Sequence, residues 1–263
     1  MYTARLPMAR LAQIDRLDHF SPRSRPRSCG AKHMLNSDYL SDIPNMHTWD
    51  DGKTWNTGGF DAAHLSKLLD FLKENRCRHI IETGAGNSTI TFLLHGAERV
   101  VSIAPEEDLF DRISSYCVAN SIDRSALQAV VGFSQWALPE IARNHTSEFD
   151  FALIDGHHGW PLVFVDFCYM NHAVRQGGFI MVDDVDLHSV RELVNLLNEQ
   201  PGYESCLDLG KALIFQKTTD ASALPEWNEQ PYIVRSSANT AVQTQREHPL
   251  RSMRRRLRLH WPR

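Results

Sequence analysis

Three acidic residues and two adjacent histidines follow apolar runs in this sequence of 263 residues, and these side chains are well suited to chemistry. Asp155, His157 and His158 lie in "LIDGHHGWP", and Asp183 and Asp184 lie in "GFIMVDDV". Carboxylates that converge repel unless protons or a cation neutralise them, and a few hard oxygen ligands favour Mg²⁺. A histidine accepts protons near neutral pH. The structural alternative is that Asp183 caps a helix, Asp184 is solvated and the histidines bond to backbone.

A glycine turn, "ETGAGNST" at residues 82–89, is the second chemically meaningful feature. Glycine lets the backbone approach a ligand closely, so Gly84 and Gly86 favour a binding turn between a strand and a helix. The dinucleotide fingerprint requires a third glycine where Thr89 stands. It also favours an acid at the end of the next strand, where Ala104 stands. These two departures count against an NAD(P)-binding oxidoreductase, which is kept as an alternative.

Regular elements must position these residues, and the first is an amphipathic helix. Leu65, Leu68, Leu69 and Leu72 recur at helical spacing behind Asp61, a predicted N-cap. Helix-like and apolar strand-like runs then alternate, with strands expected at residues 79–83, 99–103, 127–131, 149–155, 178–184, 203–207 and 212–217.

This alternation predicts an α/β fold: a Rossmann-like, doubly wound, seven-stranded and mostly parallel sheet with helices on both faces. Ligands of such folds bind outside the carboxyl ends of the strands. Asp155 ends the fourth predicted strand, and Asp183 and Asp184 end the fifth. If these strands are neighbours, the three carboxylates converge on one spot.

The chain divides into three predicted parts, the first of which shows little periodicity. We expect an N-terminal extension at residues 1–48 that is a lid, a dimer arm or disordered, a catalytic domain at 49–218, and a C-terminal extension with a basic tail at 219–263. Residues 1–30 and 251–263 each contain six arginines, whereas residues 31–250 hold 16 basic and 30 acidic residues, a net charge near −14. Such an acidic middle argues against a specific nucleic-acid partner.

The composition also limits where in the cell the protein is expected and which other partners it has. No run of 18 apolar residues exists, so no membrane span is expected, and the first residues lack the apolar core of a secretory signal. The five cysteines form no CxxC pair and no even framework, which is typical of reduced thiols in a cytoplasmic protein. We expect a small-molecule substrate, and a homo-oligomer stays open because the extension could be a dimer arm.

The glycine turn resembles motif I, E-x-G-x-G, of the class I S-adenosylmethionine (SAM)-dependent methyltransferases. The resemblance implies that the turn wraps the methionine end of SAM, through Glu82, Gly84, Gly86 and Ser88. It covers about residues 60–217. One departure is Ala104, which stands where the family usually has an acid that holds the ribose hydroxyls.

Three further segments resemble the metal-dependent catechol- and macrolide-type O-methyltransferases: "VVGFSQWALP", "IDGHH" and "RQGGFIMVDDV". By position, the resemblance places Ser134 and Gln135 beside the adenine. It makes Asp155, Asp183 and Asp184 ligands of a divalent metal, expected to be Mg²⁺, and His158 the general base.

The resemblance therefore predicts a SAM-dependent methyltransferase that O-methylates a small hydroxylated molecule, a sugar or a natural product, with the help of a divalent metal. The main alternative is a SAM-fold protein that binds without catalysis, favoured by Ala104. The intact set of strand-end aspartates argues against it.

Overall fold

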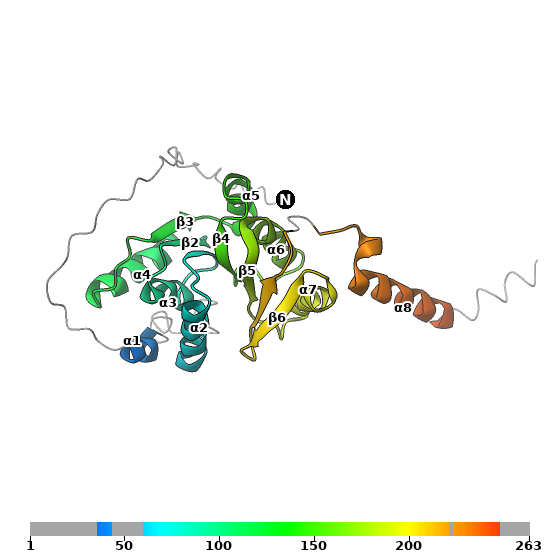
Figure 1. Cartoon of the computed structure of the whole chain (residues 1–263), viewed down its shortest axis with the longest axis horizontal. Coiled ribbons are helices and arrows are strands. Elements are labelled where there is room, and N and C mark those ends of the chain that lie inside the picture. Colours follow the sequence, from blue (N-terminus) through cyan, green and yellow to red (C-terminus); the bar gives the residue numbers. More distant parts are fainter. Residues whose placement is uncertain (1–35, 44–59, 221–223, 248–263) are drawn as a thin grey trace, which may run out of the picture. The chain divides into compact units, whose positions relative to one another are not determined.

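One seven-stranded sheet forms the centre of the fold (Figure 1). The computed structural model describes residues 36–43, 60–220 and 224–247. The strand order is β3-β2-β1-β4-β5-β7-β6. The first five of these are parallel, whereas β7 runs antiparallel to both β5 and β6. The strands are β1 His79–Thr83, β2 Arg99–Ala104, β3 Leu127–Val131, β4 Phe149–Ile154, β5 Val174–Val182, β6 Tyr203–Asp208 and β7 Leu213–Lys217. The predicted fold class is confirmed.

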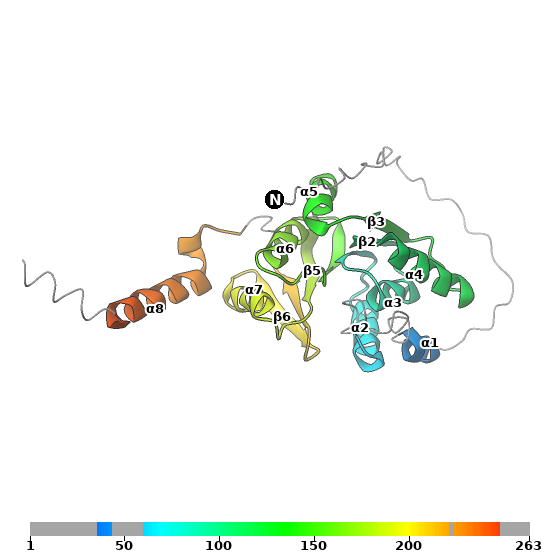
Figure 2. The same ribbon diagram turned by 180° about the vertical axis from the view of Figure 1, so that it is seen from behind.

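Helices cover both faces of this sheet, α2 to α4 on one side and α5 to α7 on the other (Figures 1 and 2). They are α1 Asn36–Asp42, α2 Ala62–Glu74, α3 Asn87–His95, α4 Glu107–Ala119, α5 Ser134–Asn144, α6 Leu162–Ala173, α7 His188–Glu199 and α8 Pro231–Glu247, with a 3₁₀ helix, η3, at Trp227–Glu229. Helix α2 begins as predicted, because the Asp61 carboxylate accepts the backbone N–H of His64 at 2.9 Å.

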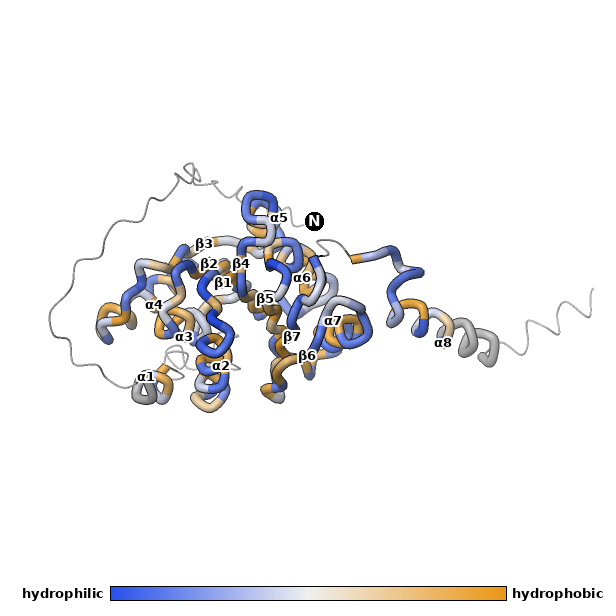
Figure 3. Tube along the Cα trace, viewed as in Figure 1, coloured by the Kyte–Doolittle hydropathy of each residue, from blue (hydrophilic) through white to orange (hydrophobic). Residues whose placement is uncertain are grey.

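The strands carry apolar residues on both faces because both faces are buried. Ile80 packs into the core on the side of α2 to α4, and the next residue, Ile81, packs on the side of α5 to α7. Phe151 and Ala152 divide in the same way on β4. Figure 3 shows hydrophobic residues gathered in the central strands. Burial on both faces is what removes the polar alternation from the strand sequences.

The two predicted extensions include described helices. Helix α1 lies N-terminal to the predicted boundary at residue 49, yet its Leu40 and the following Ile43 are buried in the same core as α2. Helix α8 lies in the predicted C-terminal extension, and its Arg235 Nε donates to Glu199 of α7 at 3.1 Å. Within the described ranges, none of the helices combines the length and the apolar character that a bilayer crossing requires.

Sheet topology brings four turns to one edge. Strand β1 lies between β2 and β4, so the chain reverses its winding there, which is where doubly wound folds bind ligands. The turns after β1, β4 and β5 meet at this edge. The turn that precedes β7 joins them, because β7 starts beside the end of β5, with Leu213 opposite Val182.

Candidate active site

Backbone hydrogen bonds hold the ends of β1, β4 and β5 in register. Asp155 N–H donates to the Thr83 carbonyl at 3.1 Å, and Asp183 N–H donates to the Ile154 carbonyl at 3.1 Å. Gly84 has φ of +87°, and a Cβ atom there would lie 2.4 Å from the Asp155 carbonyl oxygen. Only glycine fits this position, since both the dihedral and the close approach exclude a side chain. The turn after β1 and the loop after β4 are thus in direct contact.

Glu82 lies beneath the glycine turn, fully buried. Its carboxylate accepts hydroxyl hydrogen bonds from Ser88 at 2.6 Å, and from Thr89 and Ser102 at 2.5 Å each. Burial raises the pKa of Glu82 to about 7, although the three hydroxyls oppose this shift. The Thr89 hydroxyl also accepts the Gly86 N–H at 2.9 Å. Glu82 therefore holds the turn in place from below.

Sequence reasoning missed two of these hydroxyls. The sequence marks Thr89 only as a departure from the dinucleotide fingerprint, and no motif points to Ser102. Ser102 stands opposite Glu82 in the β1–β2 register, so knowledge of strand pairing is needed to find it.

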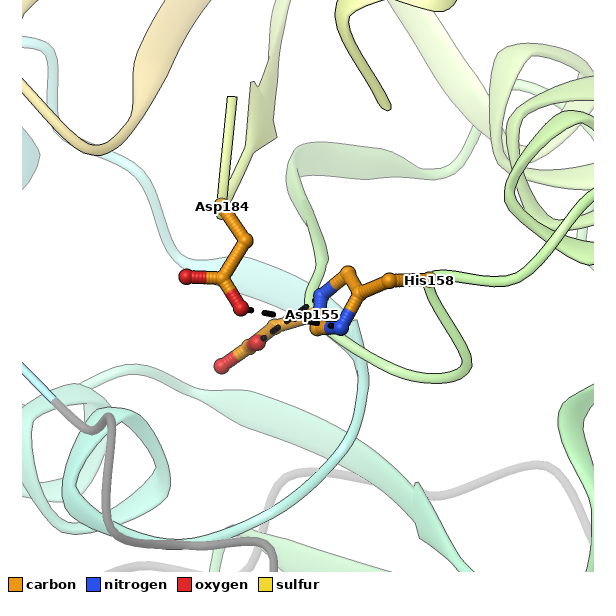
Figure 4. Close-up of side chains that lie close together, drawn as sticks. All are labelled: Asp155, His158 and Asp184. Carbon is orange, nitrogen blue, oxygen red and sulfur yellow. Dashed lines mark ion pairs between the residues drawn. The ribbon is translucent and has the colours of Figure 1, made fainter. Parts of the chain in front are cut away.

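The ring of His158 faces two carboxylates, those of Asp155 and Asp184 (Figure 4). Its Nε2 is 3.5 Å from Asp155 Oδ1, and its Nδ1 is 3.6 Å from Asp184 Oδ2. Burial of the ring opposes protonation, but Asp155 and Asp184 outweigh it, and the pKa of His158 is raised. The backbone of Asp184 is left-handed, with φ of +53°, a conformation that aspartate tolerates better than most residues.

These three residues fit a divalent cation. One ligand atom each from Asp155, His158 and Asp184 lies within 4.8 Å of the others, and carboxylate and imidazole are ordinary metal ligands. His158 Nε2 and Asp183 Oδ1 are buried without a hydrogen-bond partner among the described residues. The structure thus groups Asp155 and Asp184 with His158, and Asp183 is not a member of this group.

Asp183 faces Lys211, a residue that sequence reasoning missed. Lys211 Nζ lies 3.1 Å from Asp183 Oδ2 and 3.3 Å from Asp184 Oδ1. Burial and the negative charge of Asp155 raise the pKa of Asp183 to about 8. Lys211 comes from the turn between β6 and β7, where its carbonyl accepts the Val185 N–H at 3.0 Å.

Ser134 and Gln135 begin α5 at the same sheet edge. The preceding loop is tied to β2, since Gly132 N–H donates to the Ala104 carbonyl at 2.9 Å. Ser134 is buried and Gln135 is half-buried. Asp166 of α6 is also fully buried; burial raises its pKa, and the Ser134 hydroxyl partly offsets this. Ser134 and Gln135, the residues predicted to lie beside the adenine, therefore lie at the same edge of the sheet as the glycine turn.

His157 forms a hydrogen bond within its own loop, where its Nδ1 accepts the Gly159 N–H at 2.9 Å. The loop continues to Trp160, which is 67% exposed. A cavity of about 370 Å³ is lined by Trp160, His188, Ser189 and Glu192. The Ser189 hydroxyl donates to the His158 carbonyl, so the cavity adjoins the loop that carries His158.

Comparison with known proteins identifies the domain. Residues 81–185 match the model of a family described as a methyltransferase domain. No curated protein matches the chain. The chain is similar to the solved structure of the O-methyltransferase TomG from Streptomyces achromogenes, which acts in tomaymycin synthesis and was crystallised with SAM. The two are 18% identical, with a TM-score of 0.56 over 72% of this chain and 92% of that one.

Two further structures share the fold. The O-methyltransferase from Bacillus cereus, in complex with S-adenosylhomocysteine (SAH), is 18% identical, with a TM-score of 0.55 over 69% of this chain and 97% of that one. The SAH-bound methyltransferase PaMTH1 from Podospora anserina is 11% identical, with a TM-score of 0.54 over 73% and 100%. The matched region, which is described as a methyltransferase domain, contains the glycine turn and the ends of β4 and β5. The fold around it is shared with solved methyltransferases that bind SAM or SAH.

Proposed function

We propose that this methyltransferase transfers the methyl group of SAM to a hydroxyl of a small molecule. The observation that carries the proposal is the position of His158 between Asp155 and Asp184, at the edge where the glycine turn also lies. Such a site combines a group that can accept a proton with a turn that can hold a cofactor. The structural neighbours TomG and the Bacillus cereus enzyme are both O-methyltransferases, which supports oxygen as the acceptor atom.

SAM would bind along the edge formed by the glycine turn and the start of α5. The backbone at Gly84, Gly86 and Ser88 would hold the methionine end, and Ser134 and Gln135 would lie beside the adenine. In this proposal Glu82 acts on the cofactor through the turn, because its carboxylate is fully buried and engaged by three hydroxyls. Ala104 leaves the end of β2 without an acid for the ribose.

His158 would remove the proton from the acceptor hydroxyl. The acceptor oxygen attacks the methyl carbon of SAM, the carbon–sulfur bond breaks with its electron pair going to sulfur, and SAH leaves. The carboxylates of Asp155 and Asp184 would orient the ring and stabilise the imidazolium that forms. General base catalysis of this kind contributes about 10²–10⁴ in rate.

Asp155 and Asp184 would hold a divalent cation, expected to be Mg²⁺, with Asp183 as the third carboxylate. Such an ion, when bound, lowers the pKa of an acceptor hydroxyl and fixes its oxygen. His158 is close enough to serve as a ligand in place of Asp183. A ring nitrogen that binds metal cannot take a proton, so the two roles of His158 exclude each other and can be separated by experiment.

The cavity beside Trp160 would receive the acceptor. Trp160 offers an exposed aromatic surface, packed edge-on against Phe164 with ring centroids 4.9 Å apart. Ser189 and Glu192 add polar groups that can bond to hydroxyls. An aromatic wall with a few polar groups suits a small hydroxylated molecule.

Calorimetric titration with SAH tests the cofactor assignment, with NAD⁺ as the control. We expect SAH to bind and NAD⁺ not to bind, because the chain lacks the third glycine and the ribose acid of the dinucleotide fingerprint. Binding of NAD⁺ without SAH would reject the proposal. Binding of SAH without methyl transfer to any of a panel of hydroxylated compounds would favour the non-catalytic alternative.

A further inference from the structure

Lys211 brings a positive charge to the carboxylates that are proposed to bind a metal ion. It reaches the acidic edge from the turn between β6 and β7, and its Nζ lies 3.1 Å from Asp183 and 3.3 Å from Asp184. The ammonium also lies over the ring of Phe60, with Nζ 4.7 Å from the ring centroid. Its side chain is only 22% exposed, so water screens these contacts less than it would at the surface.

We propose that Lys211 is the internal counter-cation of the acidic edge and sets how tightly this site binds a divalent ion. This inference rests on the metal site of the proposed function. Asp155, Asp183 and Asp184 bring three carboxylates to adjoining strand ends, and Asp183 is almost fully buried. Lys211 compensates two of these carboxylates at once. It also repels a second cation from the same edge.

The contacts of Lys211 distinguish this role from an ordinary surface ion pair. An exposed pair contributes little, whereas Lys211 is held by its own turn, by an aromatic ring and by two carboxylates. Both carboxylates follow directly after β5, where the predicted metal ligands lie. Removing the ammonium therefore leaves these carboxylates to be compensated by protons or by a bound divalent ion. A divalent ion then no longer competes with the ammonium for the same oxygens.

The test compares Mn²⁺ binding and thermal unfolding for the wild type, Lys211→Met, Lys211→Arg and Lys67→Met. Methionine keeps much of the apolar stem without the charge, arginine keeps the charge, and Lys67 is an exposed lysine on α2 that controls for net charge. We expect Lys211→Met to bind Mn²⁺ at least about tenfold tighter than the wild type, since like charges a few ångströms apart repel strongly at low effective dielectric. Without metal it should unfold at a lower temperature, and Mn²⁺ should raise that temperature more than in the wild type.

Lys211→Arg and Lys67→Met should both behave like the wild type. Equal or weaker Mn²⁺ binding by Lys211→Met, when the wild type binds Mn²⁺, would overturn the role of Lys211 and leave the metal site standing. Absence of Mn²⁺ binding in every variant would overturn both the metal site and the role of Lys211. SAH titration of the same samples shows whether the cofactor site is intact, so a failure of the methyltransferase proposal is seen separately.

Discussion

At the scale of single residues, His158 carries the proposed chemistry. Both ring nitrogens face carboxylates, at 3.5 Å and 3.6 Å, so the ring is fixed and its protonated form is stabilised. His157, the adjacent residue, bonds to Gly159 within the loop. Two neighbouring residues of the same type thus have different surroundings, and this gives a matched pair for mutation.

His158→Ala should lower kcat by about 10²–10⁴, the usual contribution of a general base. SAH affinity should hardly change, because proton removal belongs to the chemical step. His157→Ala should cost much less activity. The rates are measured with an acceptor found by screening, and the affinities by calorimetry.

Three results would count against the base role. A His158→Ala enzyme that is nearly as fast as the wild type would leave proton removal to another group. A large loss of Mn²⁺ affinity in His158→Ala would instead make His158 a metal ligand. Equal losses at both histidines, together with weak SAH binding, would indicate collapse of the loop.

At the scale of elements, the turn after β1 and the loop after β4 depend on Gly84. The positive φ of this residue and its closeness to the Asp155 carbonyl leave no space for a Cβ atom. A substitution here acts first on the backbone that joins two strand ends, and only then on the cofactor.

Gly84→Ala should therefore lower the free energy of unfolding by more than about 2 kcal/mol, as expected for a non-glycine residue forced into a left-handed conformation with a close contact. Gly132→Ala is the control. A Cβ atom at Gly132 would meet nothing within 4 Å, and the change should stay within about 0.5 kcal/mol. Urea unfolding measures both. A Gly84→Ala variant with wild-type stability that fails only to bind SAH would show that space for the ligand is the main requirement.

The opposite edge of the sheet is held by Asp150 at the start of β4. Its carboxylate accepts the backbone N–H groups of Arg78 and His79 at 2.8 and 2.9 Å and the Arg175 side chain at 2.7 Å. Burial alone would raise the pKa of Asp150, but the hydrogen bonds from His79, Arg175 and Arg78 outweigh it and the pKa is lowered. One carboxylate thus joins β1, β4 and β5.

Asp150→Ala should lower the free energy of unfolding by about 1–3 kcal/mol at pH 7. Because the folded pKa is below the ordinary value, this stability is present above the ordinary pKa of aspartate and is lost as the pH falls through the folded pKa. The gap between the wild type and the variant should close below about pH 4. Asp70→Ala, at an exposed position on α2, is the control. A gap that stays constant down to pH 3 would contradict this account.

At the scale of the whole molecule, periodicity predicted the sheet, the helices and the edge at which the turns meet. It worked because strands buried on both faces are continuously apolar and helices such as α2 repeat their leucines at helical spacing. Strand ends predicted Asp155, Asp183 and Asp184 at this edge, and the structure groups Asp155 and Asp184 with His158.

The arrangement of side chains within the site depends on contacts between residues that are far apart in the sequence. Asp183 and Asp184 are adjacent, so their side chains leave the strand end in different directions, and periodicity does not say which of them faces His158. Lys211 enters the site only because β7 is antiparallel to β5. Glu82 accepts a hydrogen bond from the hydroxyl of Ser102 on the neighbouring strand. Pairing partners, rather than residue types, decided these contacts.

The strand order has a consequence for biosynthesis. The ribosome releases β5 and β6 before β7, yet β7 is the strand that pairs with β5. Among the described strands, β6 pairs with β7 alone. The nascent chain therefore exposes an apolar strand edge, the kind of edge that recruits chaperones or other chains, until residue 217 has emerged. Lys211 closely precedes β7 and emerges just before it. The pairing of β7 with β5 therefore also brings the ammonium of Lys211 to the acidic edge.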